Sequence, residues 1–385
     1  MDKKLSRRKF LKTAGAAGLL LPAAGCITTE STKKDVTEPS PDKVVYRTLG
    51  KTGLKVSGVG YGIGFVPIPE VVNRALDMGV NYFDTSRVYG DSEKIFGEII
   101  KKRDRSKLVI ATKSGMRRKE DILKDIDTSL KALGTDYVDI YHLHARDTPT
   151  AIPDEALEAV QEIKKSGKAR FLGFSCHDPN RMVDFSIENK FDVMQTTYSY
   201  AIGGYYRDRA IKKLHEAGIG VIAMKVVVAL TGLNLLNLEN KPAKEGEGPL
   251  SGIKWVLTNP AIGTTVPHMK TIQELEMNFR AMSEPYTPAD EKTLYVMNEQ
   301  IRPSYCRMCY ECSGKCPQNL PITDMMRFLA YNDYCGNYHQ AKMSFMELPE
   351  EVKSVRCSDC SECNINCPNG VHVQDRLIRA QELLT

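Results

Sequence analysis

The middle of the chain alternates short apolar runs with longer segments in which apolar residues recur every three or four positions. The short runs are rich in β-branched residues and have the length of buried strands. The longer segments have the spacing of amphipathic helices, and the one at 154–167 ends on Gly167, a favourable helix terminus. Eight strands are expected, at 55–62, 80–86, 108–114, 137–144, 169–175, 192–198, 220–225 and 261–267.

Eight strands, each followed by a helix, predict an α/β fold of the (β/α)8 TIM-barrel type over residues 44–290. The alternative, an open doubly wound sheet, needs a glycine-rich phosphate-binding turn after its first strand, and residues 60–70 do not supply one. Polar residues stand at the C-terminal ends of five strands, where the βα loops of a barrel converge on the active site. They are Asp84, Lys113, His144, Ser175 and Gln195.

Four residues of this region suit proton transfer to an oxygen, namely Asp84, Tyr89, Lys113 and His144. A tyrosine hydroxyl exchanges protons poorly at neutral pH unless its neighbours tune it, because its ordinary pKa is about 10. A nearby lysine favours the phenolate, a carboxylate keeps that lysine charged, and an imidazole can hold a carbonyl oxygen. Each residue taken singly also fits a structural role. As a group they favour carbonyl reduction by hydride, or its reverse.

The segments “YRTLGKTGLKVSGVGYG”, “MGVNYFDTSRVYGDSEKIFGE”, “LVIATKSG” and “DYVDIYHLHARD” closely resemble the aldo/keto reductase superfamily over residues 44–282. The resemblance implies a barrel that interconverts a carbonyl and an alcohol by hydride transfer with NAD(P). It also implies that Tyr89 is the general acid/base, that Lys113 and Asp84 tune it, and that His144 orients the substrate carbonyl.

The same resemblance implies contacts to the nicotinamide nucleotide at Ser175, Gln195, Met224, Lys225, Lys270 and Asn278. Three positions depart from the family pattern. Cys176 stands where an asparagine usually holds the carboxamide, and Met224 where an aromatic ring usually stacks on the nicotinamide. Glu274 occupies a position at which NADPH-dependent members often carry an arginine, although Lys270 offers a point charge nearby. NAD and NADP therefore both stay open.

Two cysteine runs near the C-terminus repeat the spacing C-x2-C-x2-C-x3-C-P, the signature of proteins that bind two [4Fe–4S] clusters. Three thiolates of each run bind one cluster, and the fourth binds the other. The first cluster is expected on Cys306, Cys309, Cys312 and Cys367, and the second on Cys357, Cys360, Cys363 and Cys316. A structural zinc site would favour paired C-x2-C arms with longer gaps, and cysteines spaced this tightly are poor disulfide partners.

Residues 300–385, which contain both runs, resemble the all-helical ferredoxin-like domains that transfer electrons in larger redox enzymes. Apolar residues have helical spacing between the runs and again at 373–384. Two further cysteines, Cys176 and Cys335, are expected to be buried, inert thiols. A cluster carries one electron and a hydride carries two, so a flavin or a redox partner protein would have to divide the pair. No flavin motif is apparent.

The first 26 residues have a basic start, a short apolar run and small residues, as in an export signal. Within them, “SRRKFLK” resembles a twin-arginine signal. Cys26 ends a segment similar to a lipobox, so it is expected to carry a lipid anchor, although cleavage within “AAG” by the ordinary signal peptidase is an alternative. Residues 27–43 are polar and aperiodic, as in a flexible linker.

The formal net charge of +5 equals the charge of the first twelve residues, so the rest of the chain is balanced. This balance excludes the basic field that nucleic-acid binding requires. The sequence therefore predicts an oxidoreductase on the periplasmic or cell-surface side of the membrane. It would act on a small carbonyl or alcohol and exchange electrons through two clusters with a partner protein.

The alternative is an electron-transfer or scaffold lipoprotein whose barrel is idle and whose clusters serve a redox partner. The intact catalytic group favours the enzyme, whereas the altered nucleotide positions favour the scaffold. Substrate, direction of reaction, electron partner and oligomeric state are left open by the sequence.

Overall fold

The computed structural model describes residues 43–64, 66–202, 204–228 and 247–385, which lie in one compact unit. The export signal at 1–26, with the anchor position Cys26, lies outside the described residues, as does all of the linker except residue 43. Among the described helices, none is long and apolar enough to cross a membrane.

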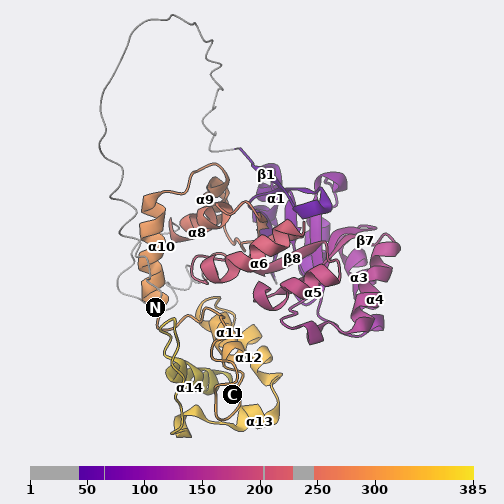
Figure 1. Cartoon of the computed structure of the whole chain (residues 1–385). Coiled ribbons are helices and arrows are strands. Elements are labelled where there is room, and N and C mark those ends of the chain that lie inside the picture. Colours follow the sequence, from indigo (N-terminus) through magenta and orange to yellow (C-terminus); the bar gives the residue numbers. More distant parts are fainter. Residues whose placement is uncertain (1–42, 65, 203, 229–246) are drawn as a thin grey trace, which may run out of the picture. The chain divides into compact units, whose positions relative to one another are not determined.

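Eight parallel strands form one sheet in which each strand pairs with the next along the chain. They are β3 (Tyr61–Gly62), β4 (Tyr82–Asp84), β5 (Val109–Ser114), β6 (Val138–Leu143), β7 (Ala169–Cys176), β8 (Val193–Thr197), β9 (Gly220–Met224) and β10 (Ile262–Thr265). The two ends of the sheet meet, because Gly60 donates its backbone N–H to the carbonyl of Thr265 at 2.8 Å and Val59 bridges to Thr265. The predicted (β/α)8 barrel is therefore confirmed (Figure 1).

The first expected strand, 55–62, is wrong as a single element. Its first part, β2 (Lys55–Ser57), pairs antiparallel with β1 (Tyr46–Thr48) in a separate two-stranded sheet, and only β3 joins the barrel. The chain passes very close to its neighbours between the two parts. A Cβ on Gly60 would lie 2.9 Å from the ring of Tyr82, so this approach requires glycine and interrupts the strand.

The helices that follow the strands turn apolar faces towards the barrel. In α3 (Lys119–Leu133), Ile122, Ile126 and Leu133 are buried on one face, and Gly134 ends the helix in the left-handed conformation with φ 65°. The other barrel helices among the described residues are α1 (Pro69–Asp77), α2 (Ser92–Ile100), α4 (Asp154–Lys165), α5 (Val183–Glu188), α6 (Gly204–Glu216), α8 (Glu247–Leu257) and α9 (Ile272–Phe279).

All regular structure described after the barrel is helical. The elements are α10 (Pro288–Ile301), α11 (Ile322–Asp333), α12 (Tyr338–Met346), α13 (Glu350–Ser354) and α14 (Val373–Leu384). Figure 1 shows α11, α12 and α14 side by side, and their apolar side chains form a core distinct from that of the barrel. Residues 300–385 are called the helical domain below.

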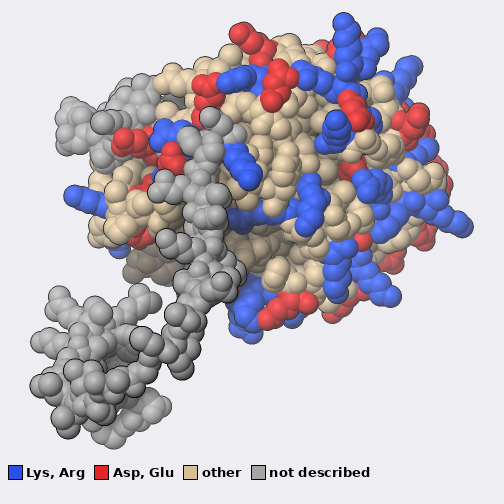
Figure 2. Space-filling view, turned by 90° about the horizontal axis from the view of Figure 1, so that it is seen from above, with Lys and Arg blue, Asp and Glu red and all other residues tan. Residues whose placement is uncertain are grey.

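Charges of both signs are interspersed over the face shown in Figure 2. Ion pairs at the surface of the described residues include Arg74 with Glu276 at 2.8 Å and Arg103 with Asp77 at 2.7 Å. Exposed pairs of this kind contribute at most about 1 kcal/mol each, because solvent screens them. Their mixture is what the balanced charge of the chain after residue 12 leads one to expect.

Candidate active site

Three of the expected residues, each at or near the C-terminal end of a strand, form one hydrogen-bonded group. They are Asp84, Lys113 and Gln195. Lys113 of β5 places Nζ 2.6 Å from Oδ2 of Asp84, the last residue of β4, and 2.6 Å from the carbonyl of Thr85. Gln195 of β8 donates from Nε2 to the same Asp84 oxygen at 3.1 Å. The side chains of Lys113 and Asp84 are only 2% and 6% exposed, so solvent barely screens their attraction.

Tyr89 and His144 lie next to this ion pair. Their rings meet edge to face with centroids 5.7 Å apart, and Lys113 Nζ is 5.5 Å from the centroid of the Tyr89 ring. Ser86 Oγ is 3.1 Å from Nδ1 of His144, so Nε2 is the ring nitrogen left to meet a substrate oxygen. The structure thus brings together all four residues expected to transfer and direct a proton.

Burial sets the protonation states of this group. Burial, and then the charge of Asp84, raise the pKa of Tyr89, a direction opposite to the shift expected from Lys113 alone. Burial lowers the pKa of Lys113 against the opposing effect of Asp84, and burial also holds the pKa of His144 well below its ordinary value. At neutral pH the site therefore presents a protonated phenol and a neutral imidazole, and both can hydrogen-bond a carbonyl oxygen.

Comparison with known proteins also indicates similarity to enzymes that oxidise alcohols or reduce carbonyls. Residues 68–249 match the aldo/keto reductase family. L-galactose dehydrogenase of Arabidopsis thaliana is 28% identical over 288 residues, which cover 63% of this chain and 89% of that protein. L-glyceraldehyde 3-phosphate reductase of Escherichia coli (strain K12) is 29% identical over 235 residues, which cover 52% of this chain and 68% of that protein. The barrel is an aldo/keto reductase domain.

Solved structures agree with this domain in fold. An aldo-keto reductase from Bacillus halodurans aligns with a TM-score of 0.55 and 24% identity, covering 66% of this chain and 96% of that chain. Together with its relatives, the aldo/keto reductase domain makes the chain an oxidoreductase.

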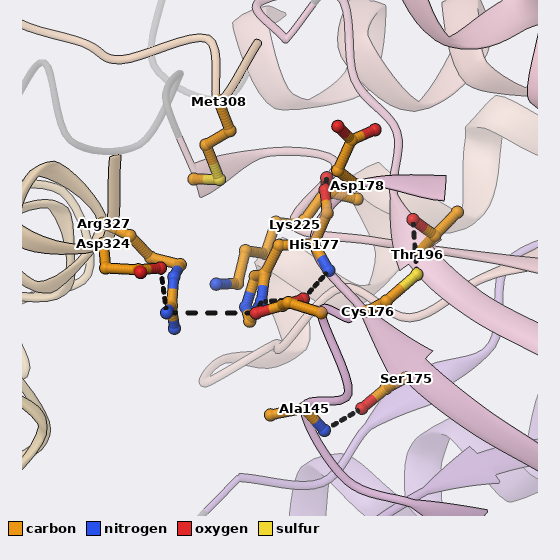
Figure 3. Close-up of polar contacts among 12 residues, drawn as sticks. Ala145, Ser175, Cys176, His177, Asp178, Thr196, Lys225, Met308, Asp324 and Arg327 are labelled. Atoms are coloured by element: carbon orange, nitrogen blue, oxygen red, sulfur yellow. Dashed lines mark hydrogen bonds and ion pairs between the residues drawn. The ribbon is translucent and has the colours of Figure 1, made fainter. Parts of the chain in front are cut away.

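In the aldo/keto reductase domain, two side chains are available at the expected carboxamide site. Ser175 of β7 accepts the backbone N–H of Ala145 at 2.8 Å (Figure 3), which leaves its own hydroxyl hydrogen to donate. Oε1 of Gln195 is buried and has no hydrogen-bond partner among the described residues. A buried acceptor without a partner fits an amide N–H of nicotinamide. Cys176 offers no such contact, because its sulfur turns to Thr196 Oγ1 at 3.6 Å inside the core.

The other expected nucleotide residues follow β9 and β10. Met224 ends β9, and the side chain of Lys225, the next residue, reaches the helical domain. Lys270 is exposed, and its backbone N–H bonds to the carboxylate of Glu274 at 2.6 Å. Asn278 is buried on α9. A carboxylate therefore stands beside Lys270, at the place where an NADP 2′-phosphate would be expected.

Sequence reasoning missed a polar cluster that the helical domain shares with the barrel. His177 Nδ1 is 2.9 Å from Oδ2 of Asp147, and Arg327 of α11 reaches the same carboxylate at 3.9 Å (Figure 3). The hydroxyl of Tyr331, also on α11, is 3.4 Å from His177 Nε2 and 3.4 Å from Lys225 Nζ. No local pattern signals such contacts, because His177 and Tyr331 are 154 positions apart in the chain.

The predicted cluster cysteines line two hollows in the helical domain. The first hollow contains Cys306, Cys309, Cys312 and Cys367. The second contains Cys316, Cys357, Cys360 and Cys363. Each hollow thus combines three cysteines of one run with the last cysteine of the other run, which is the combination that the spacing signature requires.

The ten cysteines of the described residues are all free thiols. Within the same residues, no group of three or more His, Cys, Asp or Glu side chains could hold a metal ion as placed. The ligands of a [4Fe–4S] cube bind four separate irons, so they stand further apart than the ligands of a single ion. Cys176 is buried as expected, whereas Cys335 is exposed, so its expected burial is wrong.

Proposed function

We propose that the chain is an exported, lipid-anchored oxidoreductase whose barrel interconverts a carbonyl and an alcohol and whose helical domain exchanges the electrons through two [4Fe–4S] clusters. The observation that carries the electron-transfer part is the sorting of eight cysteines into two hollows, each with cysteines of both runs. A structural zinc site would instead bring together the paired cysteines of C-x2-C arms. Bound clusters would supply one-electron transfer.

Two hydrogen bonds to sulfur suit thiolate ligands in the first hollow. Met308 directs its backbone N–H to Cys306 Sγ at 3.3 Å, and Asn369 directs Nδ2 to Cys309 Sγ at 3.3 Å. Met308 has the left-handed backbone conformation, with φ 52°, so the loop turns tightly around the sulfur atoms. Donors of this kind offset the negative charge that a thiolate–cluster unit carries, and they tune its reduction potential.

In the barrel, Tyr89 donates a hydrogen bond or a proton to the substrate oxygen, and His144 orients that oxygen. Ser175 and Gln195 would hold the nicotinamide amide, and NAD(P) would supply or accept the hydride when bound. A flavin or a redox partner protein would have to divide the electron pair between this two-electron chemistry and the clusters. The position of Glu274 beside Lys270 favours NAD over NADP, because a carboxylate repels a 2′-phosphate.

The substrate class follows from the relatives. By their names, one oxidises L-galactose and the other reduces L-glyceraldehyde 3-phosphate. Both compounds carry a carbonyl or hemiacetal carbon next to a carbon that bears a hydroxyl group. We therefore assign the substrate to the sugar-like hydroxyaldehydes and the alcohols that correspond to them.

The location belongs to the same proposal. The segment at 1–26 would direct twin-arginine export, which carries folded proteins, so clusters inserted in the cytoplasm can leave with the chain. A lipid on Cys26 would then tether it to the periplasmic or cell-surface side of the membrane. Free nicotinamide nucleotide is scarce there, so the nucleotide has to stay bound and be regenerated in place.

One observation favours the scaffold alternative, in which the barrel is idle and the clusters serve a redox partner. Position 176, where the family has an asparagine, presents no group to a carboxamide. An idle barrel would bind no nucleotide and would leave Tyr89 without a function.

Anaerobic purification of the full chain separates these possibilities. We expect about eight iron atoms and as many labile sulfides per chain, and a nicotinamide nucleotide released on denaturation. Cys335→Ser is the matched control and should keep the full iron content. Zinc in place of iron would overturn the cluster assignment. Iron without nucleotide, together with a tightly bound redox subunit, would select the scaffold.

A further inference from the structure

The two cysteine runs have the same spacing but differ in the residues between their cysteines. In the first run, Arg307 and Met308 follow the first cysteine and are only 9% and 2% exposed. In the second run, Ser358 and Asp359 stand at the same two positions, and both are exposed. The first loop is therefore covered by other parts of the protein, whereas the second is open to solvent.

Side chains of the barrel provide this cover. Tyr206 of α6 donates its hydroxyl hydrogen to the carbonyl of Cys309 at 2.7 Å. Its neighbour Arg207 is fully buried and directs Nη2 to the carbonyl of Met308 at 3.4 Å. The guanidinium carbon of Arg181, which follows β7, lies 4.4 Å from the centroid of the Tyr310 ring. Residues 308, 309 and 310 thus each contact a different side chain of the barrel.

The backbone of the first loop has an unusual conformation where the barrel holds it. Met308 and Tyr310 have φ values of 52° and 58°, in the left-handed region that residues with a Cβ seldom adopt. Such a residue costs about 1 kcal/mol or more, so it persists only where surrounding contacts maintain it. The corresponding residues of the second run, Asp359 and Ser361, are not among the described residues with positive φ. The loop that contacts the barrel is the one with the strained backbone.

The second loop is held by the helical domain alone. Cys357 donates its backbone N–H to Oε1 of Gln381 at 2.9 Å, and Gln374 directs Nε2 to the carbonyl of Cys357 at 3.4 Å. As far as the structure describes the chain, every hydrogen bond of residues 355–367 stays within the helical domain. Asp359 and Glu362, which lie between the cysteines of this run, are exposed.

We propose that the first hollow holds the cluster on the barrel side and that the second holds the cluster that exchanges electrons with the redox partner, at the open loop 357–363. The inference rests on the proposed electron exchange through two clusters. A protein that docks on the open loop meets the carboxylates of Asp359 and Glu362, so the loop fits a redox partner with basic side chains on its docking face. Each encounter transfers one electron and no atoms.

Glu311 provides a matched comparison for Glu362. Both glutamates are exposed, and each directly precedes the third cysteine of its run. Glu311 follows Tyr310 on the loop that the barrel holds, whereas Glu362 lies on the open loop. Loss of either carboxylate makes the same change in charge beside a cysteine, so a difference between the two variants reports where a partner docks.

The first test measures how accessible each cluster is to solvent. Full-length Cys360→Ala keeps the first cluster and Cys309→Ala keeps the second, and both are reduced with dithionite. A water-soluble dysprosium chelate is added, and electron spin relaxation is measured by electron paramagnetic resonance. We expect the chelate to accelerate relaxation more strongly in Cys309→Ala. An equal or stronger effect in Cys360→Ala overturns the proposal.

The same measurement tests the cover that the barrel provides. In the Cys360→Ala protein, Arg207→Met should increase the effect of the chelate on the first cluster, because it removes a contact between α6 and the loop. Arg209→Met, at an exposed position of α6, should not. No change in Arg207→Met would contradict cover by α6. The comparison of the two cysteine variants decides the proposal even if Arg207→Met does not fold.

The second test uses a small basic cytochrome with ferric haem as the electron acceptor. The full chain is reduced with dithionite, excess reductant is removed, and the second-order rate constant of cytochrome reduction is measured at low salt. Glu362→Gln should lower it about threefold, and added salt should remove the difference, whereas Glu311→Gln should keep the original rate. A larger loss in Glu311→Gln, or equal rates in both variants, overturns the proposal. A purified chain without iron would instead remove the proposed function itself.

Discussion

At the level of single residues, the buried pair of Lys113 and Asp84 lies between the residues proposed for proton transfer and those proposed for cofactor binding. Both side chains are almost inaccessible to solvent, so the loss of one would leave the other charge without compensation. Asp84 Oδ2 also accepts a hydrogen bond from Nε2 of Gln195 at 3.1 Å. The same carboxylate therefore positions the lysine beside Tyr89 and the amide proposed to meet nicotinamide. A change at Asp84 is expected to affect both steps.

Replacement of Tyr89 by phenylalanine isolates its hydroxyl group. The ring contact with His144 is kept, so KM should change little, whereas kcat should fall about 10²–10⁴-fold because the proton donor is gone. Steady-state kinetics on a sugar-like aldehyde measure both constants. Tyr295→Phe serves as the control on an exposed tyrosine. A kcat equal to that of the unaltered protein would contradict the role of Tyr89.

His177 should make the protein sensitive to mild acid. Its pKa is lowered to about 3 in the folded state, against about 6.5 in the unfolded chain. Between these values the unfolded chain binds more protons, so stability is full above pH 6.5 and falls as the pH drops towards 3. The lowered pKa of Asp147 acts in the same direction but mainly below pH 4, where its unfolded-state carboxyl becomes protonated.

Thermal unfolding followed by circular dichroism between pH 7 and pH 4 measures this effect. Tm should decrease as the pH is lowered from 7 to 4. The slope of Tm against pH should be smaller in His177→Gln. His215→Gln, at an exposed position of α6, should leave the slope as it is. An equal slope in all three proteins would show that His177 does not bind an extra proton on unfolding.

Residues of the active site differ in how far the sequence can predict them. Asp84, Tyr89, Lys113 and His144 follow strands whose apolar pattern is clear, so their convergence can be predicted from the barrel alone. The direction of the pKa shift of Tyr89 could not be predicted, since it depends on how completely the ring is buried. The contact of Tyr331 with the barrel depends on tertiary packing alone.

At the level of elements, α6 joins the two domains through one buried arginine. Arg207 is fully buried and donates to the carbonyls of His177 at 2.5 Å and Met308 at 3.4 Å. It also forms an ion pair with Asp178 at 3.6 Å. The loop that begins the first cysteine run is therefore attached to the barrel next to the residue that faces Tyr331.

Arg207→Met should weaken this attachment. It removes one donor from the carbonyls of His177 and Met308 and leaves the buried carboxylate of Asp178 without its cation, so the free energy of unfolding should fall by about 3 kcal/mol. Urea unfolding measures the change, and limited proteolysis should cut the chain faster near residues 302–310. Arg209→Met, at an exposed position of the same helix, is the matched control. A stability equal to that of the control would show that Arg207 does not hold the domains together.

The elements themselves were mostly predictable, with an instructive exception. Apolar alternation cannot distinguish one long strand from two short ones that continue in the same direction. The prediction of one strand at 55–62 was wrong for this reason. Gly60, between β2 and β3, passes too close to Tyr82 and Thr265 for any side chain, and the strand is interrupted there. Such an approach depends on neighbouring strands that are distant in sequence.

At the level of the whole molecule, the cysteine spacing predicts more than the presence of a domain. It predicts that the last cysteine of each run crosses to the other run, and the two hollows have this composition. The sequence does not show that α11 serves both sites. Thr323, at its start, lines the first hollow, and Tyr331, two turns later, meets Lys225 of the barrel. One helix thus connects the proposed cluster site to the proposed hydride site.

Cys367 provides the sharpest test of this arrangement, because it belongs to the second run but lines the hollow of the first. Cys367→Ala should remove a ligand of the cluster assigned to Cys306, Cys309 and Cys312, and the iron content should fall by about half. The electron paramagnetic resonance spectrum of the reduced protein should match that of Cys309→Ala and differ from that of Cys360→Ala. Cys335→Ala should retain both signals. If Cys367→Ala resembles Cys360→Ala instead, each run binds its own cluster, and the pairing of the two runs through shared hollows is wrong.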